Sequence, residues 1–176
     1  MKIFAETDRL ILRAITDDDL ESMFELDSDP LVHRFLGQKP LQTQEESQRY
    51  IDHIKMQYDT YGIGRWAAIE KATGEFIGWS GLKVNFEDVF NGHENLIDVG
   101  YRLLPRYWGK GYATESGKAA IAYGFDELGL ETIYGMTELD HHASRRVLEK
   151  IGLTYVENFV LESENLPLTF YKIDRP

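Results

Sequence analysis

The sequence predicts a single α+β domain, built on a mixed, mostly antiparallel sheet of about seven strands with about four helices on its two faces. Segments with the pattern of strands outnumber segments with the pattern of helices. The early strands form hairpins and the later ones alternate with helices, which is typical of a mixed sheet covered on both sides. The 176 residues show no internal repeat or linker and fit one domain of ordinary size.

The first third of the chain predicts one strand and two helices. Alternation over Arg9–Ile15 indicates a strand, and Thr16 can cap a helix whose first turn holds three aspartates. That helix should end near Ser28, because the residue before Pro30 avoids the helical region. Thr43-Gln-Glu-Glu46 has the pattern of a capping box for a second helix that reaches about residue 58.

The remaining elements follow from alternation, helical spacing and glycine. The expected hairpin has strands Arg65–Glu70 and Glu75–Val84, and a polar loop precedes a strand over Leu96–Leu103. Apolar residues at helical spacing predict further helices, each followed by glycine. In order, the rest of the chain predicts a helix over Ala113–Leu128, a strand over Thr132–Leu139, a helix over His141–Ile151, and strands over Thr154–Glu162 and Leu168–Asp174.

The chain carries 30 acidic against 19 basic residues, a net charge of −11. Such a field repels polyanions, so it argues against nucleic acid and anionic membranes as partners. Two interpretations of the acidic excess stay open. It keeps the protein soluble, or it attracts a cationic amine.

The absence of cysteine excludes several chemistries. Disulfides, thiolate metal sites and a cysteine acyl-enzyme cannot form. No apolar stretch approaches the roughly 20 residues that span a bilayer. The segment Met1–Arg9 also lacks the apolar middle region of a signal peptide. We therefore expect a soluble cytoplasmic protein.

The most informative segment is Arg106-Tyr-Trp-Gly109-Lys-Gly111-Tyr-Ala113, between an expected strand and an expected helix. Main-chain N–H groups at a helix N-terminus are unpaired and lie at the positive end of the helix dipole, which suits a phosphate or pyrophosphate. Glycine at positions 109 and 111 permits close approach, because a Cβ would hold the anion away. Taken alone, the loop could equally be a plain turn before a helix.

Three phosphate-binding patterns can be compared with this loop. The dinucleotide pattern G-x-G-x-x-G requires a small residue where the chain has Thr114. The nucleotide-triphosphate loop requires Ser or Thr where the chain has Gly111. The third pattern, R/Q-x-x-G-x-G/A, fits Arg106, Gly109 and Gly111. There the loop resembles the acetyl-coenzyme A (acetyl-CoA) loop of the GNAT N-acetyltransferase superfamily.

Three further segments extend this resemblance. Asp140-His-His-Ala-Ser144-Arg-Arg-Val-Leu-Glu-Lys150-Ile-Gly152-Leu is similar to the N-x-x-S-x-x-V-L-E-K-x-G-F signature of the ribosomal-protein (RimJ/RimL-like) branch. Thr7-Asp-Arg-Leu-Ile-Leu-Arg13-Ala resembles the opening strand of that branch, and residues 73–82 resemble its central hairpin. Because the four matches follow the family's order, residues 1–176 are identified as one acetyl-CoA-dependent N-acetyltransferase domain.

The resemblance implies how acetyl-CoA would be held. Two middle strands, here Ile97–Leu103 and Thr132–Leu139, splay apart, and the cofactor lies in the gap. The pyrophosphate would be held chiefly by main-chain N–H groups, and the pantetheine arm and thioester carbonyl by the splayed strand. The residues implied for the cofactor are Val99, Gly100, Tyr101, Arg106, Tyr107, Trp108, Gly109, Lys110, Gly111, Tyr112, Ala113, Thr114, His141 and Ser144.

Direct acetyl transfer requires a neutral amine. An amine with a pKa near 10.4 is unprotonated in only about 1 in 10³ molecules at pH 7, so a base is expected. Asp98 matches the acidic residue that many family members carry on the strand beside the thioester, and it is the first candidate for a catalytic base. Glu94 is the second. The alternative for Asp98 is a solvent-facing residue of an alternating strand.

The departing thiolate benefits from a hydroxyl donor. Ser144 is the candidate catalytic donor, and its alternative is a small residue that lets the helix pack. Many family members have a tyrosine four positions later, where this chain has Leu148, so Tyr101 and Tyr107 are further candidates.

His141 stands where the family usually has asparagine, which leaves a base role open for it or for His142. These adjacent histidines lack partners for a zinc site, and no metal is expected.

The expected function is direct transfer of an acetyl group from acetyl-CoA to a primary amine, on a small molecule or a protein N-terminus, in a ternary complex. A homodimer is compatible with the sequence. The alternative is a catalytically weak acyl-CoA-binding sensor. The differences from the family pattern at His141 and Leu148 support it. A nucleotide-binding domain is a third interpretation, which the missing third glycine argues against.

Overall fold

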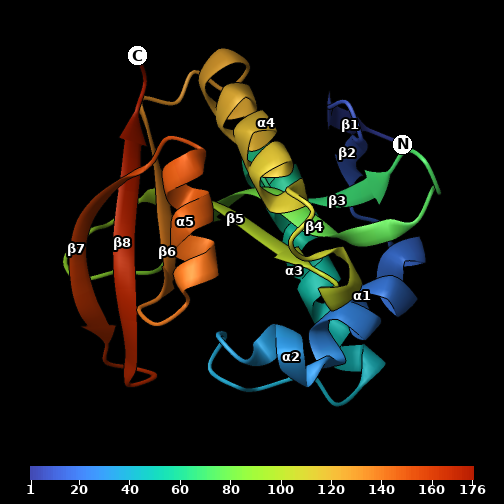
Figure 1. Ribbon diagram of the computed structural model, residues 1–176, viewed down its shortest axis with the longest axis horizontal. Coiled ribbons are helices and arrows are strands. Elements are labelled where there is room, and N and C mark those ends of the chain that lie inside the picture. Colours follow the sequence, from blue (N-terminus) through green and yellow to red (C-terminus); the bar gives the residue numbers. More distant parts are fainter.

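The computed structural model describes residues 1–176 as one open sheet of eight strands with five α-helices (Figure 1). The strand order is β1-β2-β3-β4-β5-β6-β8-β7, and every neighbouring pair is antiparallel except β5 and β6. This confirms the predicted fold class. The strands are β1 Ile3–Glu6, β2 Leu10–Ala14, β3 Arg65–Glu70, β4 Phe76–Asn85, β5 Leu96–Leu103, β6 Thr132–Glu138, β7 Thr154–Leu161 and β8 Leu166–Asp174. The helices are α1 Leu20–Ser28, α2 Pro30–His33, α3 Gln44–Tyr61, α4 Tyr112–Asp126 and α5 His142–Lys150.

Helices cover both faces of the sheet, as expected. A side chain on Gly124 of α4 would meet Leu82 of β4, whereas Tyr50 of α3 packs against Trp79 of the same strand, with ring centroids 6.4 Å apart. Residues 79 and 82 point to opposite faces, because side chains alternate along a strand. Helices α3 and α4 therefore lie on opposite sides of the sheet, and α1 packs beside α3 (Figure 1).

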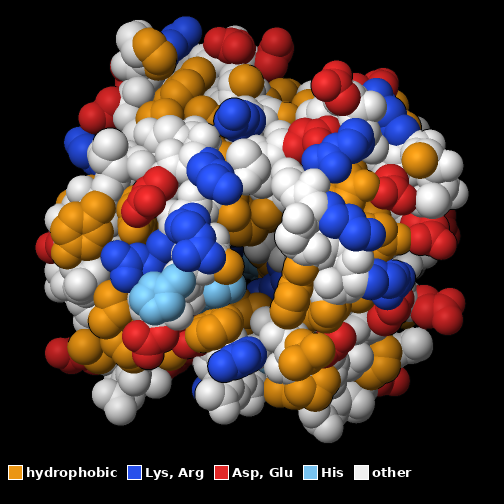
Figure 2. Space-filling model, viewed as in Figure 1, with side chains coloured by type: hydrophobic (Ala, Val, Ile, Leu, Met, Phe, Trp, Pro, Cys, Tyr) orange, Lys and Arg blue, Asp and Glu red, His pale blue; other side chains and the backbone are white.

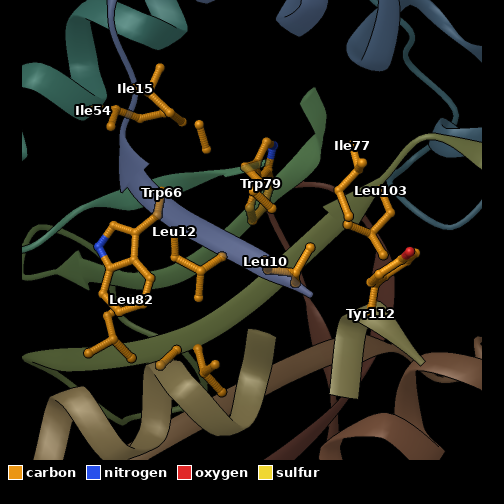
Figure 3. Close-up of a cluster of buried hydrophobic side chains, with 14 of the residues drawn as sticks. Leu10, Leu12, Ile15, Ile54, Trp66, Ile77, Trp79, Leu82, Leu103 and Tyr112 are labelled. Atoms are coloured by element: carbon orange, nitrogen blue, oxygen red, sulfur yellow. The ribbon is translucent and has the colours of Figure 1, made fainter. Parts of the chain in front are cut away.

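The hydrophobic core that fixes α4 lies on one face of β2–β4 (Figure 3). Leu10, Leu12, Trp66 and Leu82 are each at most 1% exposed there. Burying a side chain of this size contributes roughly 1.5–3 kcal/mol, so a few such residues hold the helix firmly. Because α4 begins at the glycine-rich loop, this core also fixes the position of that loop.

The sheet opens between β5 and β6. These two strands run parallel and share a single pair of Cα partners, Asp98 and Tyr134. In contrast, β4 and β5 are paired along all of Gly78–Asn85. Residues 99–103 of β5 therefore have no partner in β6, which confirms the expected splay of the two middle strands.

Two elements were not predicted. Strand β1 has only four residues and no clean alternation, so the sequence did not reveal it. Helix α2 begins at Pro30, where the sequence predicted only an end to α1. The Asp29 carboxylate accepts a hydrogen bond from the N–H of Leu31 at 2.8 Å, and proline at the first position of a helix needs no hydrogen bond there. The segment thus ends one helix and starts another.

The capping box of α3 forms as predicted. The Thr43 hydroxyl accepts from the N–H of Glu46, whose carboxylate accepts in turn from the N–H of Thr43 at 3.0 Å. The helix ends at Gly62, in the left-handed conformation with φ 69°. No helix in the structure is both long and apolar enough to cross a membrane.

Candidate active site

The glycine-rich loop follows β5 and leads into α4. Gly109 and Gly111 adopt left-handed conformations, with φ 71° and 84°, and Gly111 is the N-cap of α4. No atom lies within 4 Å of the position where a Cβ on Gly109 would stand. Glycine is therefore required for the backbone conformation, and the space above it is open to a ligand.

The main-chain N–H groups of residues 109–114 find no acceptor within the protein. The first bonded N–H of the helix belongs to Glu115, which donates to the carbonyl of Gly111 at 3.0 Å. Six consecutive donors thus lie at the positive end of the α4 dipole. This arrangement can bind an anion with several oxygens, such as a pyrophosphate.

Most side chains of the loop are bound to the rest of the protein. The guanidinium of Arg106 lies 2.7 Å from the Glu25 carboxylate, and the indole N–H of Trp108 donates to the carbonyl of Leu103 at 2.7 Å. The hydroxyls of Tyr107 and Tyr112 donate to Glu75 and Glu70, and these hydrogen bonds raise the pKa of both phenols. These four side chains shape the loop, so any anion would be held mainly by its backbone.

Two residues near the start of the chain, Thr7 and Arg9, hold the loop in place, and we call this pair the clasp. No local pattern in the sequence predicts these contacts. Arg9, in the turn between β1 and β2, donates from Nε to Glu115 at 2.7 Å and from Nη1 to the carbonyl of Lys110 at 2.9 Å. Its guanidinium lies 4.2 Å from the ring centroid of Tyr112. The Thr7 hydroxyl donates to Glu115 at 2.6 Å.

This clasp ties the loop to the first turn of α4. Beside it lies a surface depression of about 570 Å³, lined by Thr7, Asp8, Gly111, Thr114, Glu115, Lys118 and Lys150.

Tyr101 and Ser144 meet across the opening in the sheet. The Tyr101 hydroxyl lies 2.9 Å from the carbonyl oxygen of Ser144, to which it donates, and 3.1 Å from the Ser144 hydroxyl. Burial raises the pKa of Tyr101, so this phenol stays protonated and serves as a hydrogen-bond donor. Leu148, where many family members have tyrosine, is 2% exposed and belongs to the core.

His141 lies one turn before Ser144 and is half-buried. Its ring stacks on Phe35, with centroids 4.3 Å apart and planes 11° apart, and its Nδ1 lies 3.4 Å from the Thr137 hydroxyl. Burial, reinforced by the charge of His142, lowers the pKa of His141. The imidazole is therefore neutral at pH 7. No cluster of acidic or histidine side chains in the structure is arranged to hold a metal ion.

Asp98 is buried rather than facing solvent as an alternating strand residue would. It is 8% exposed. Its Oδ2 accepts from the guanidinium of Arg65 at 2.7 Å, and its Oδ1 accepts from the side-chain amide of Asn85 at 2.7 Å. A carboxylate has about four lone-pair sites, so each oxygen retains capacity for another donor. Glu94 lies exposed in the loop before β5.

Comparison with known proteins shows the family of this chain. A family model described as "Acetyltransferase (GNAT) domain" matches residues 9–154. The chain is 35% identical over 147 residues to the uncharacterized N-acetyltransferase YoaA of Bacillus subtilis, covering 84% of this chain and 80% of that protein. It is 32% identical over 164 residues to FsC-acetyl coenzyme A-N(2)-transacetylase of Aspergillus fumigatus, covering 92% and 69%.

Solved structures share the fold. Spermidine N-acetyltransferase from Vibrio cholerae, in complex with CoA and spermine, matches with a TM-score of 0.76 and 18% identity, covering 96% of each chain. The ribosomal L7/L12 α-N-protein acetyltransferase RimL, in complex with CoA, matches with a TM-score of 0.75 and 15% identity, covering 98% of each chain. These neighbours do not single out the ribosomal-protein branch. The chain belongs to the GNAT family of acetyltransferases and is an N-acetyltransferase.

Proposed function

We propose that the protein transfers the acetyl group of acetyl-CoA directly to a primary amine, with both substrates bound at once. The observation that carries this proposal is the row of six unbonded N–H groups over residues 109–114, at the end of the strand beside the opening in the sheet. Since the chain has no cysteine, a cysteine acyl-enzyme is excluded, and direct transfer is the simplest route. Bound acetyl-CoA supplies an acetyl group activated as a thioester.

The proposed cofactor contacts divide between main chain and side chain. The N–H groups of residues 109–114 would hold the pyrophosphate, and Lys110, whose ammonium lies 5.3 Å from the ring centroid of Tyr107, would add a positive charge at the loop. Main-chain groups of Val99, Gly100 and Tyr101, which lack partners in β6, would bind the pantetheine amides and the acetyl carbonyl. His141 and Ser144 would face the same arm from the N-terminal half of α5.

Two residues are proposed for proton transfer. Asp98 lies where β5 and β6 part and has capacity to accept a hydrogen bond from the amine, directly or through water. Ser144 would donate to the departing thiolate, and Tyr101 would orient it through the contact at 3.1 Å. Because the pKa of Tyr101 is raised, its role is to position Ser144 rather than to lose a proton itself.

The acceptor is an amine of a small molecule or a protein N-terminus. Relatives of this chain include proteins named for each kind of acceptor: an N(2)-transacetylase, spermidine N-acetyltransferases and a ribosomal-protein acetyltransferase. The alternative, an acyl-CoA sensor without turnover, is supported by the leucine at position 148 and the histidine at position 141.

A pair of measurements tests the proposal. Acetyl-CoA should raise the Tm of the protein, whereas ATP and NADH at equal concentration should not. Free thiol should then appear when acetyl-CoA is mixed with the protein and a panel of small amines and N-terminal peptides. Stabilisation by ATP alone would refute the cofactor assignment. Tight binding of acetyl-CoA without thiol release across the panel would favour the sensor.

A further inference from the structure

The face of the sheet that packs against α1 and α3 carries charged side chains, although a sheet face covered by helices is usually apolar. The register aligns Trp79 with Arg102 and Lys83 with Asp98, so their side chains share this face. Trp79 packs against Tyr50 of α3, and Arg102 pairs with Asp27 of α1, which places the face beneath those helices. We call this set the charged face: Arg65, Trp79, Lys83, Asp98 and Arg102.

The absence of a side chain at Gly100 makes room for Arg65, one of the three cations of this face. Arg65 donates from Nη1 to the carbonyl of Gly81 at 2.7 Å, and a Cβ on Gly100 would stand 2.6 Å from its Nη2. The guanidinium therefore lies over Gly100, with its centre 5.1 Å from the ring centroid of Trp79. Arg102 lies 4.9 Å from the same ring.

One cation of this face forms no ion pair. Asp98 is paired with Arg65 at 2.7 Å, and the incoming carboxylate of Asp27 is paired with Arg102 at 2.6 Å. Lys83 forms no ion pair and no hydrogen bond within the protein. Burial lowers the pKa of Lys83, and the nearby Arg65 and Arg102 act in the same direction, whereas the carboxylates of Asp98 and Asp88 act in the opposite direction.

The unpaired cation is within reach of a small molecule. Lys83 is partly exposed, and the Arg102 side chain is 19% exposed, against 7% for Arg65. The molecule is hollowed at the centre of one face, and the blue of a Lys or Arg side chain is visible inside the hollow (Figure 2). The indole N–H of Trp79 is buried and has no acceptor.

The charged face also reaches the point where acetyl transfer would occur. Asp98 belongs to it and is the residue at which β5 and β6 part. Resting on the proposed function, we propose that the acceptor amine carries a carboxylate, which pairs with Lys83 and Arg102 while the amine lies near Asp98. A carboxylate would give Lys83 an ion-pair partner and would accept hydrogen bonds from buried donors that are unpaired, such as Trp79 Nε1 and Arg102 Nε.

The cations Lys83 and Arg102 work against a polyamine. A second ammonium group would add like charge beside Lys83 and Arg102, whereas nearby cations lower the pKa of a single bound amine and so favour its reactive neutral form. The net charge of −11 does not reverse this preference against a second ammonium group, because exposed charges are screened over about 8 Å at physiological ionic strength. The nearest charges therefore decide the preference.

A matched series of amines tests the proposal on the full-length protein. Lysine, lysinamide and cadaverine share an aminopentyl chain and differ in the carboxylate, so thiol release gives kcat/KM for each. A seryl-glutamate amide and its seryl-lysine counterpart test the same contrast at a peptide N-terminus. We expect at least a tenfold preference for lysine over cadaverine and for the acidic over the basic peptide.

Variants at position 83 connect this preference to the charged face. Lys83→Met should raise the KM of the carboxylate-bearing amine at least tenfold and leave the KM of acetyl-CoA unchanged. Lys83→Arg should restore most of the preference, and the Tm of each variant reports that it is folded. Lys172→Met, which removes an equal charge from an exposed position on β8, should change neither KM.

The outcomes separate this inference from the function on which it rests. A preference for cadaverine, or a carboxylate preference that survives in Lys83→Met, overturns the inference and leaves the acetyltransferase intact. Absence of thiol release from every amine, with or without binding of acetyl-CoA, overturns the proposed turnover and this inference together.

Discussion

The carboxylate of Asp98 and the guanidinium of Arg65 form a buried ion pair at 2.7 Å, with side chains 11% and 7% exposed. The pair joins β3 to β5 across β4, and Arg65 also donates to the main-chain carbonyls of Gly81 and Asp98. The residue proposed to receive the amine proton is thus also a structural partner of an arginine. The catalytic role and the structural role of Asp98 lead to different predictions.

Replacing Asp98 separates the roles. We expect Asp98→Asn to lower kcat at least about 100-fold, the usual scale for loss of a general base, measured by thiol release at saturating acetyl-CoA. It should also lower the free energy of unfolding by about 3–5 kcal/mol, measured in urea, because the buried guanidinium loses its counter-charge. Asn85→Ala removes the other partner of the carboxylate and should keep kcat within about threefold, since the carboxylate remains. Equal losses of kcat in both variants would assign Asp98 a structural role alone.

A glycine at the far end of α4 serves as a control for the glycine-rich loop. Gly109 precedes α4 with φ 71° and Gly129 follows it with φ 65°, and a Cβ at either position would meet no atom within 4 Å. Replacement by alanine should cost both variants about 1–2 kcal/mol of stability, since each forces a left-handed alanine. Only Gly109→Ala should raise the KM of acetyl-CoA, by at least about tenfold, because only that loop is proposed to bind phosphate. Equal KM values in the two variants would contradict this assignment.

Arg9 should act on the cofactor site without touching the cofactor. Arg9→Gln removes the ion pair with Glu115 and the hydrogen bond to Lys110, so we expect the KM of acetyl-CoA to rise several-fold while the KM of the amine stays the same. The Tm should change little, since the Arg9 side chain is 44% exposed and exposed pairs contribute about 0–1 kcal/mol.

The matched control for Arg9 is Lys55→Gln, which breaks an exposed ion pair with Asp17 away from the loop. It should leave both KM values unchanged. A rise in the amine KM of Arg9→Gln as large as that for acetyl-CoA would indicate a general loss of structure.

Ser144 and Tyr101 can be separated by their hydroxyl groups. Ser144→Ala should reduce kcat about tenfold or more at saturating substrates, because the departing thiolate loses its donor. Tyr101→Phe should lower the free energy of unfolding by about 1 kcal/mol, the net value of one hydrogen bond, and should reduce kcat less than Ser144→Ala. If the phenylalanine variant is the slower enzyme, the hydroxyl of Tyr101 acts on the substrate itself.

His141 should make stability depend on pH. Burial lowers its pKa, so the unfolded chain binds this proton more readily than the folded protein, and the free energy of unfolding falls as pH drops through about 6.5. His33, whose pKa is lowered by burial and by Arg102, acts in the same direction. His141→Asn should therefore reduce, without abolishing, the fall in Tm between about pH 7.5 and 5.5. His142→Asn, at the exposed neighbouring position, should retain most of the fall.

Much of the fold could be predicted because its signals are local. The capping box at Thr43, the glycine after α3 and the alternation of Arg65–Glu70 each specify backbone geometry within a few residues. The short strand β1 and helix α2 escaped detection, since four residues carry too little periodicity to stand out. The opening between β5 and β6 came from the family resemblance, whereas the order of the strands was established only by the tertiary structure.

The sequence by itself determined the glycine-rich loop with its row of free N–H groups, because left-handed glycines and a helix N-terminus create unpaired N–H groups whatever surrounds them. Only the tertiary structure decided the partners of the charged residues. Arg9 meets Glu115 from 106 residues away, and Arg102 meets Asp27 from 75. Such contacts depend on how helices pack across the sheet, which no local pattern encodes. That packing also leaves Lys83 without an ion pair, which is the feature from which we infer a carboxylate on the acceptor.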